Sequence, residues 1–288
     1  MDRIGPTFFE EENRVKNLVV RAISGAVLVA LVVLSILLSS CYCFGVLFFA
    51  VMMLSLVEFY KMAEKIEGVS VDKWMGLAGG VVLYAAAFFV SFLGISVTLF
   101  SVYALYVSVL MAFELFRGKQ SPIQNLSATL LGHLYVSVPF VLFCLVEGAT
   151  QQSKYLLLAF FVIIWASDTG AYLVGRFFGR HKMFERISPK KTWEGFAGGL
   201  IFAMVSGYIF HRLAVVDTLE LAFWLTLSAG VFVFGVLGDL VESMFKRCVG
   251  VKDSGNLIPG HGGFLDRFDS ALLAAPVLYL LFSWVVYL

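Results

Sequence analysis

Nine long runs of apolar residues follow one another along the chain, separated by short polar segments that hold most of the charges. Because a helix must offer roughly 20 apolar residues to cross the hydrocarbon core of a bilayer, each run predicts a transmembrane helix. We expect these helices at residues 18–38, 43–60, 74–93, 95–113, 126–146, 155–175, 195–213, 219–245 and 268–287. The pattern predicts an all-α integral membrane protein with about nine transmembrane helices.

Composition agrees with this prediction. The chain is 60% hydrophobic and 14% charged, whereas soluble domains contain about 45–50% apolar and about 25% charged residues. We therefore expect membrane lipids around it. The cysteines, Cys41, Cys43, Cys144 and Cys248, fall in no metal-ligand spacing and imply no disulfide framework.

The placement of basic residues predicts the orientation of the helices. If the nine helices alternate in direction, all but Lys154 and Arg212 of the 21 Lys and Arg residues fall on one side. Basic loops remain in the cytoplasm. We therefore expect a multi-pass protein of a cell inner (plasma) membrane, with a cytoplasmic N-terminus, an outside C-terminus and an active site that faces the cytoplasm.

Ionisable residues divide the chain into two regions. In the first region, residues 1–150, helices one to five contain almost nothing ionisable away from their ends, and the exceptions are Glu58, Glu114 and His133. We interpret the two glutamates as solvated at cytoplasmic helix ends and His133 as a hydrogen-bonded packing residue. Residues 151–288, helices six to nine with their loops, are much richer in polar residues and form the predicted catalytic region.

Two polar features open this catalytic region. Asp168 lies within an apolar run, where burial is costly unless a cation, a metal or a buried Arg compensates. In the next loop, Lys190 and Lys191 precede Thr192 at a predicted helix start, an arrangement suited to phosphate oxygens. A basic run of this kind also binds anionic lipid headgroups, and that interpretation stays open.

The end of the eighth predicted helix is polar on one face. Asp239, Glu242, Ser243 and Lys246 recur at positions i, i+3, i+4 and i+7. Because hydrocarbon would expel such a face, it must line an aqueous cavity or the bundle interior.

The ninth predicted helix follows a glycine-containing loop. Gly262 and Gly263 after His261 allow backbone amides to approach a phosphate, and Asp266 and Asp269 can converge on one cation from the opening turn of the helix. Carboxylates without a Cys/His cluster favour a hard ion such as Mg²⁺.

Residues 243–269 read S-M-F-K-R-x4-K-D-S-G and then, from position 261, H-G-G-F-L-D-R-F-D. This stretch resembles the signature of the phosphatidate cytidylyltransferase (CDP-diacylglycerol synthase) family. Residues 167–172, S-D-T-G-A-Y, and 188–195, S-P-K-K-T-W-E-G, are also similar to that family. Helices one to five carry no comparable motif.

The resemblance implies transfer of the cytidylyl group of CTP to phosphatidic acid, which gives CDP-diacylglycerol and pyrophosphate. It implies a Mg²⁺-dependent site in which aspartates hold the metal, and it leaves room for a second, monovalent cation such as K⁺. The implied metal ligands are Asp239 and Asp266, followed by Asp269 and Asp253. The implied catalytic residues are Asp239, Asp266, Asp269 and Lys246. The substrate-binding candidates are Asp168, Lys190, Lys191, Ser243, Arg247, Lys252, His261, Gly262 and Gly263.

Two other functions remain as alternatives. A CTP-dependent lipid-alcohol kinase would share the metal and the nucleotide but move the terminal phosphoryl group. An ion-coupled transporter would use the carboxylates of helices six, eight and nine as coupling sites. We expect no nucleic-acid partner, and the sequence leaves open whether the chain forms a homodimer.

Overall fold

The computed structural model describes residues 8–38, 41–150, 152–216, 218–258, 260 and 262–287. In this part of the chain eight helical segments are long and apolar enough to cross a membrane, and α1 (Phe8–Leu37) adds a shorter apolar stretch, Ala22–Leu37. The protein is an all-α membrane protein, as predicted. Each of the nine predicted runs corresponds to one of these segments.

The first region contains α1 and the helices that follow it up to residue 147. They are α2 (Cys41–Ala63), α3 (Lys73–Leu93), the 3-10 turn η1 (Val97–Phe100), α4 (Ser101–Arg117), α5 (Pro122–Gly132), the π-helical turn η2 (His133–Ser137) and α6 (Val138–Glu147). The predicted helix at 126–146 is therefore made of α5, η2 and α6. Gly94 ends α3 with a φ of 66°, in the left-handed conformation that favours glycine.

The second region contains four long helices and one small hairpin. In chain order they are α7 (Ser153–Phe178), β1 (Lys182–Phe184), β2 (Ser188–Thr192), α8 (Trp193–Arg212), α9 (Leu221–Cys248) and α10 (Leu265–Tyr287). The strands pair antiparallel, and the hydrophobic pattern did not predict them. Helix α7 packs along α8, and α9 packs along α10.

A cluster of aromatic rings joins the two regions. The ring of Phe48 on α2 lies 5.9 Å from that of Phe143 on α6 and 6.0 Å from that of Phe161 on α7. The ring of Phe161 also lies 6.2 Å from that of Phe268 on α10. Edge-to-face contacts of this kind favour one fixed packing of the rings, so the second region is held firmly against the first.

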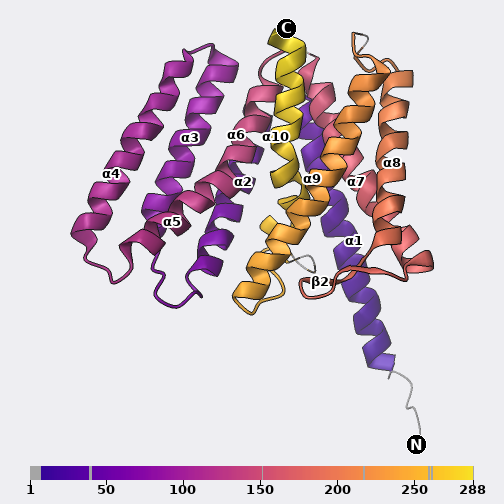
Figure 1. Cartoon of the computed structure of the whole chain (residues 1–288), viewed down its shortest axis with the longest axis horizontal. Coiled ribbons are helices and arrows are strands. Elements are labelled where there is room, and N and C mark those ends of the chain that lie inside the picture. Colours follow the sequence, from indigo (N-terminus) through magenta and orange to yellow (C-terminus); the bar gives the residue numbers. More distant parts are fainter. Residues whose placement is uncertain are drawn as a thin grey trace, which may run out of the picture.

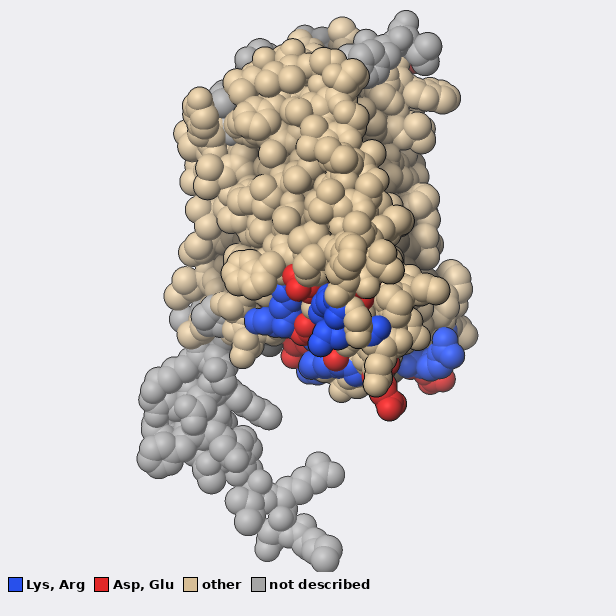
Figure 2. Space-filling model, turned by 90° about the vertical axis from the view of Figure 1, so that its left-hand side faces the viewer, with Lys and Arg blue, Asp and Glu red and all other residues tan. Residues whose placement is uncertain are grey.

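The polar connections gather at one end of the bundle. The α2–α3 and α4–α5 loops, the β-hairpin and the α9–α10 loop all lie at the lower end in Figure 1. On the face shown in Figure 2, the Lys, Arg, Asp and Glu side chains concentrate at that end, below an uncharged surface. The predicted grouping of the basic loops at one end is confirmed.

Three buried polar residues of the first region test the sequence interpretation. Glu58 and Glu114, expected to be solvated, are only 2% and 5% exposed, and that expectation is wrong because other helices and loops cover both ends. His133 is a hydrogen-bonded packing residue, as predicted. Its Nε2 lies 2.7 Å from the Gly76 carbonyl and its Nδ1 lies 3.0 Å from the Tyr103 hydroxyl.

Candidate active site

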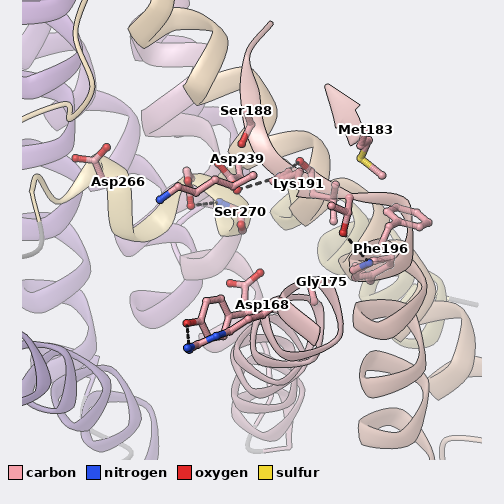
Figure 3. A pocket seen from close by; sticks show the side chains of 18 of the residues that line it. Asp168, Gly175, Met183, Ser188, Lys191, Phe196, Asp239, Asp266 and Ser270 are labelled. Atoms are coloured by element: carbon pink, nitrogen blue, oxygen red, sulfur yellow. Dashed lines mark hydrogen bonds and ion pairs between the residues drawn. The ribbon is translucent and has the colours of Figure 1, made fainter. Parts of the chain in front are cut away.

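A cavity of about 620 Å³ opens among α7, the β-hairpin, α8, α9 and α10 (Figure 3). This volume lies in the range of small-molecule sites, about 300–1,000 Å³. Five acidic residues line the cavity: Asp168, Asp239, Asp253, Asp266 and Asp269. Five basic residues also line it: Arg176, Lys190, Lys191, Lys246 and Arg267. The described lining belongs entirely to the second region.

Three of the carboxylates come from three different helices. Asp168 on α7, Asp239 on α9 and Asp269 on α10 are close enough for their charges to act on one another. Helices α9 and α10 approach closely beside them, since a Cβ atom at Gly238 would lie 3.1 Å from the Ser270 Cα. Like charges in such proximity repel and require compensation by a cation.

Lys191 supplies part of that compensation. Its ammonium group lies 2.9 Å from Asp239 Oδ2, and it donates to the Val236 carbonyl at 3.1 Å. Figure 3 shows this ion pair, with Asp168 facing the same space from the other side. The structure thus brings the predicted residues Asp168, Lys191, Asp239 and Asp269 together.

The donor chemistry fits a hard cation, because carboxylate oxygens are the ligands that Mg²⁺ prefers. Among the described residues no set of three His, Cys, Asp or Glu side chains is already arranged around one ion position. The argument for a cation here therefore rests on the repulsion among the carboxylates of Asp168, Asp239 and Asp269, which a bound cation would relieve.

Asp266, a leading metal-ligand candidate, has a different set of partners. Its Oδ1 accepts from Lys246 Nζ at 2.7 Å. Its Oδ2 accepts from the Gly263 amide at 2.8 Å and from the amide and hydroxyl groups of Ser254, both at 2.9 Å. These contacts tie the α9–α10 loop to the first turn of α10, so Asp266 organises the cavity wall as well as lining it.

The polar face of α9 points into the bundle, as predicted. Glu242 is fully buried, and Ser243 and Lys246 are each 8% exposed. Lys246 forms ion pairs with both Glu242 and Asp266, and the Ser243 hydroxyl donates to Asp239 at 3.2 Å. This face carries the ionic framework beneath the cavity rather than a surface toward lipid.

The β-hairpin carries Lys190 and Lys191, and hydrogen bonds at its two ends hold it in place. Thr192 precedes α8, and its hydroxyl accepts from the Gly195 amide at 3.1 Å, so the predicted helix start is confirmed. Glu194 accepts from the amides of Arg180 and His181 at 3.0 and 3.2 Å. These bonds close the hairpin and place Lys190 and Lys191 over the cavity.

Some predicted substrate-binding residues lie elsewhere. Within the described part of the chain, the lining does not include Ser243, Arg247, Lys252, Gly262 or Gly263. Arg247 is exposed and donates to the Val251 carbonyl at 3.0 Å, and Lys252 is exposed. His261 lies outside the described residues.

Arg176 and Tyr172 were missed by the sequence interpretation. They line the cavity with Asp168, and Arg176 donates to the Tyr172 hydroxyl at 2.9 Å. Residues 168, 172 and 176 are spaced four apart and therefore share one helix face. That spacing is visible in the sequence, and it could have identified Tyr172 and Arg176 as candidates.

A second cavity of about 60 Å³ adjoins the acidic wall. Leu28, Val29 and Val32 of α1 line one side of it, and Asp168 and Asp269 belong to its lining as well as to that of the larger cavity. Asp168 and Asp269 thus border both cavities.

This fold and cavity define a class: a polytopic helical membrane protein whose carboxylates and lysines face one polar cavity. A family model matches residues 19–285, and the chain belongs to the cytidylyltransferase family. The predicted family membership is confirmed.

The relatives include three proteins, from different genera, that are named phosphatidate cytidylyltransferase. The chain is 41% identical to the one of Staphylococcus saprophyticus over 175 residues, which is 60% of this chain and 65% of that protein. It is 44% identical to the one of Bacillus subtilis over 153 residues, 53% of this chain and 56% of that protein. It is 50% identical to the one of Haemophilus influenzae over 125 residues, 42% and 43% of the two chains. The matched segments span less than two thirds of each relative.

Proposed function

We propose that this protein transfers the cytidylyl group of CTP to phosphatidic acid, forming CDP-diacylglycerol and pyrophosphate for phospholipid biosynthesis. The observation that carries the proposal is the cavity in which Asp168, Asp239 and Asp269 face a wall of basic side chains. Membership of the cytidylyltransferase family and the names of the relatives support it.

The reaction makes one bond and breaks one. A phosphate oxygen of phosphatidic acid attacks the α-phosphorus of CTP, and the bond from that phosphorus to the oxygen shared with the β-phosphate breaks. The electron pair leaves on pyrophosphate. Because the nucleophile is already an anion, the protein needs no Ser/His/Asp triad, but it must offset the repulsion between the anions.

The basic side chains are suited to that task. Lys190, Lys191 and Arg176 line the cavity beside the acidic wall and would hold the phosphates of CTP in place for attack. Arg267 also lines the larger cavity and belongs to the lining of the smaller one, so it is the group we assign to the phosphate of the lipid. Charged hydrogen bonds from these groups would strengthen as negative charge develops on pyrophosphate.

We propose Asp239 and Asp269, with Asp168 beside them, as the residues that would hold Mg²⁺. The ion would neutralise phosphate oxygens and stabilise the leaving group. Asp266 we assign to the support of this wall, because its oxygens are occupied by Lys246, Ser254 and Gly263.

The second cavity suggests how the lipid reaches the site. Phosphatidic acid keeps its acyl chains in hydrocarbon, so its headgroup must arrive from the side of the bundle. The second cavity, among α1, α7 and α10, is lined by apolar side chains together with Asp168, Arg267 and Asp269, and we propose that the lipid approaches there. The protein would then lie in an inner (plasma) membrane, and the charged end of the bundle would face the cytoplasm, where CTP is found.

A labelling experiment tests the proposal. Purified protein in lipid nanodiscs would be given phosphatidic acid, Mg²⁺, K⁺ and CTP labelled at either the α- or the γ-phosphorus. We expect the α-label in the lipid product and the γ-label in pyrophosphate, with both transfers abolished by EDTA. Label from the γ-position in lipid would instead establish a kinase. No transfer, together with ion uptake into sealed vesicles, would establish a transporter.

A further inference from the structure

Glu58 links the first region to the loop that precedes α10. It lies near the end of α2 and is 2% exposed. Its Oε2 accepts from the Leu265 amide at 2.9 Å and lies 3.1 Å from the Ser254 hydroxyl. These partners are about 200 residues away in the sequence, at the two ends of the segment 254–265.

The loop is shaped around this carboxylate. A Cβ atom at Gly255 would lie 2.8 Å from Glu58 Cδ, and one at Gly263 would lie 2.6 Å from the same atom. At either position a Cβ atom would displace the carboxyl group, so the two glycines allow the backbone to wrap it. Gly255 and Gly263 therefore pack directly against the Glu58 carboxyl group.

The contacts of Glu58 continue directly into the cavity wall. The Ser254 hydroxyl lies 3.1 Å from Glu58 Oε2 and 2.9 Å from Asp266 Oδ2, so its proton serves either carboxylate. Asp266 in turn pairs with Lys246 of α9 at 2.7 Å. A chain of contacts therefore runs from α2 through the loop to α10 and α9.

Glu58 also acts on the start of α10. Leu265 is the first residue of that helix, and its amide is one of the groups that a helix leaves without an internal partner. A carboxylate at a helix N-terminus satisfies this amide and interacts favourably with the helix dipole. The position at which α10 begins decides where Asp266 and Asp269 stand.

We propose that Glu58 is a positioning residue for the cytidylyl transfer proposed above. It holds the α9–α10 loop and the first turn of α10 so that Asp253 and Asp269 face the cavity. It does this from the first region without touching a substrate, since Glu58 is not among the described residues that line the cavity. The expected effect of Glu58 on turnover rests on the proposed function, whereas its expected effect on the α9–α10 loop does not.

The test compares two substitutions at Glu58, one that removes the charge and one that shortens the side chain. Glu58→Gln keeps the length and an acceptor oxygen, whereas Glu58→Asp keeps the charge but is one methylene too short to reach Leu265 and Ser254. We expect E58D to lower kcat by about 10- to 100-fold, as the loss of a supporting contact does. The KM for CTP should change by less than about threefold. E58Q should remain within about fivefold of wild-type turnover, because the reach is preserved.

Glu114→Asp is the matched control. Glu114 is a glutamate of the first region with similar burial, and it accepts from Asn125 Nδ2 at 2.6 Å rather than from the α9–α10 loop. E114D should lower thermal stability and leave turnover per folded molecule unchanged. If E58D shows wild-type turnover per folded molecule, or if E114D loses as much turnover as E58D, the positioning role is overturned.

Hydrogen exchange separates this inference from the proposed function. Without substrate, the amides of Ser254, Gly263 and Leu265 should exchange about tenfold faster in E58D than in the wild type, while α8 is unaffected. Unchanged exchange would overturn the inference even in an active enzyme. Failure of the wild type to transfer cytidylyl groups would overturn the proposed function and leave this result intact. Should E58D not fold, Ser254→Ala removes the bridging hydroxyl and is expected to give the same pattern with a smaller amplitude.

Discussion

The two regions of this protein use carboxylates in opposite ways. In the first region, Glu114 is enclosed by protein donors. In the second region, Asp168, Asp239 and Asp269 face a cavity and one another. Burial alone therefore does not mark a functional carboxylate in a membrane bundle. The distinguishing property is whether the protein itself supplies the compensating charge, or leaves space for a ligand to do so.

The partners of Glu114 illustrate the first case. Asn125 and Arg117 contact its two oxygens at 2.6 and 3.1 Å. Arg117 also donates to the Ser70 carbonyl at 2.6 Å, and the Ser70 amide donates to Asn125 Oδ1 at 2.7 Å. The network joins the α2–α3 loop to α4 and α5, and it closes on itself.

The largest difference between the regions should appear when Asp239 is replaced by Asn. The change keeps the shape and removes a charge from the proposed metal site, so we expect activity to fall by at least a factor of about 100. Thermal stability should change little, because Asp239 is partly exposed, with a side-chain exposure of 37%. Turnover across a Mg²⁺ titration and thermal unfolding would be measured on the same samples.

Asp72→Asn provides a matched comparison in the first region. Asp72 caps α3, and its Oδ1 accepts from the Met75 amide at 2.9 Å. Asparagine caps a helix about as well as aspartate, so the replacement should lower stability only through the lost interaction of the charge with the helix dipole, by about 0.3–1 kcal/mol, without changing turnover. Near-normal turnover of D239N at saturating Mg²⁺ would remove Asp239 from the metal site and weaken the contrast between the regions.

The two regions also differ in how far the sequence could predict them. The positions of the transmembrane helices followed from length and hydropathy, which the bilayer constrains strongly. The π-helical turn at His133–Ser137 and the hairpin of β1 and β2 carry no such periodic signal, and they were not predicted.

The same limit applies to the site. Asp239 and Lys246 were recognisable because they share a helix face, and Asp168 because it interrupts an apolar run. Glu58 was misinterpreted because a glutamate at a helix end is usually solvated, and its partners at 254 and 265 belong to a distant segment. Contacts between segments far apart in the chain leave no pattern in local spacing.

An intermediate effect is expected from Lys191→Met. This change keeps the apolar stem but removes the cation that lies 2.9 Å from Asp239. The KM for CTP should rise by about tenfold, equivalent to the loss of one charged hydrogen bond. Lys182→Met, at an exposed position of the same hairpin that does not line the described cavity, is the control and should leave KM unchanged. Equal effects of the two variants would show that the hairpin acts only through its overall charge.

The smallest effect on turnover is expected from Asn125→Leu in the first region. Asn125 is 1% exposed, and a leucine of similar volume would leave Glu114 Oε1 and the Ser70 amide without the partners they have in the native network. Buried polar groups left without partners lower the free energy of unfolding by about 1–3 kcal/mol each. Thermal unfolding should therefore move to lower temperature, while kcat per folded molecule stays within about twofold of the wild type, because none of these groups lines the cavity among the described residues. A large fall in kcat with no loss of stability would mean that the first region shapes the reaction through more than Glu58, and the functional boundary between the regions would have to be redrawn.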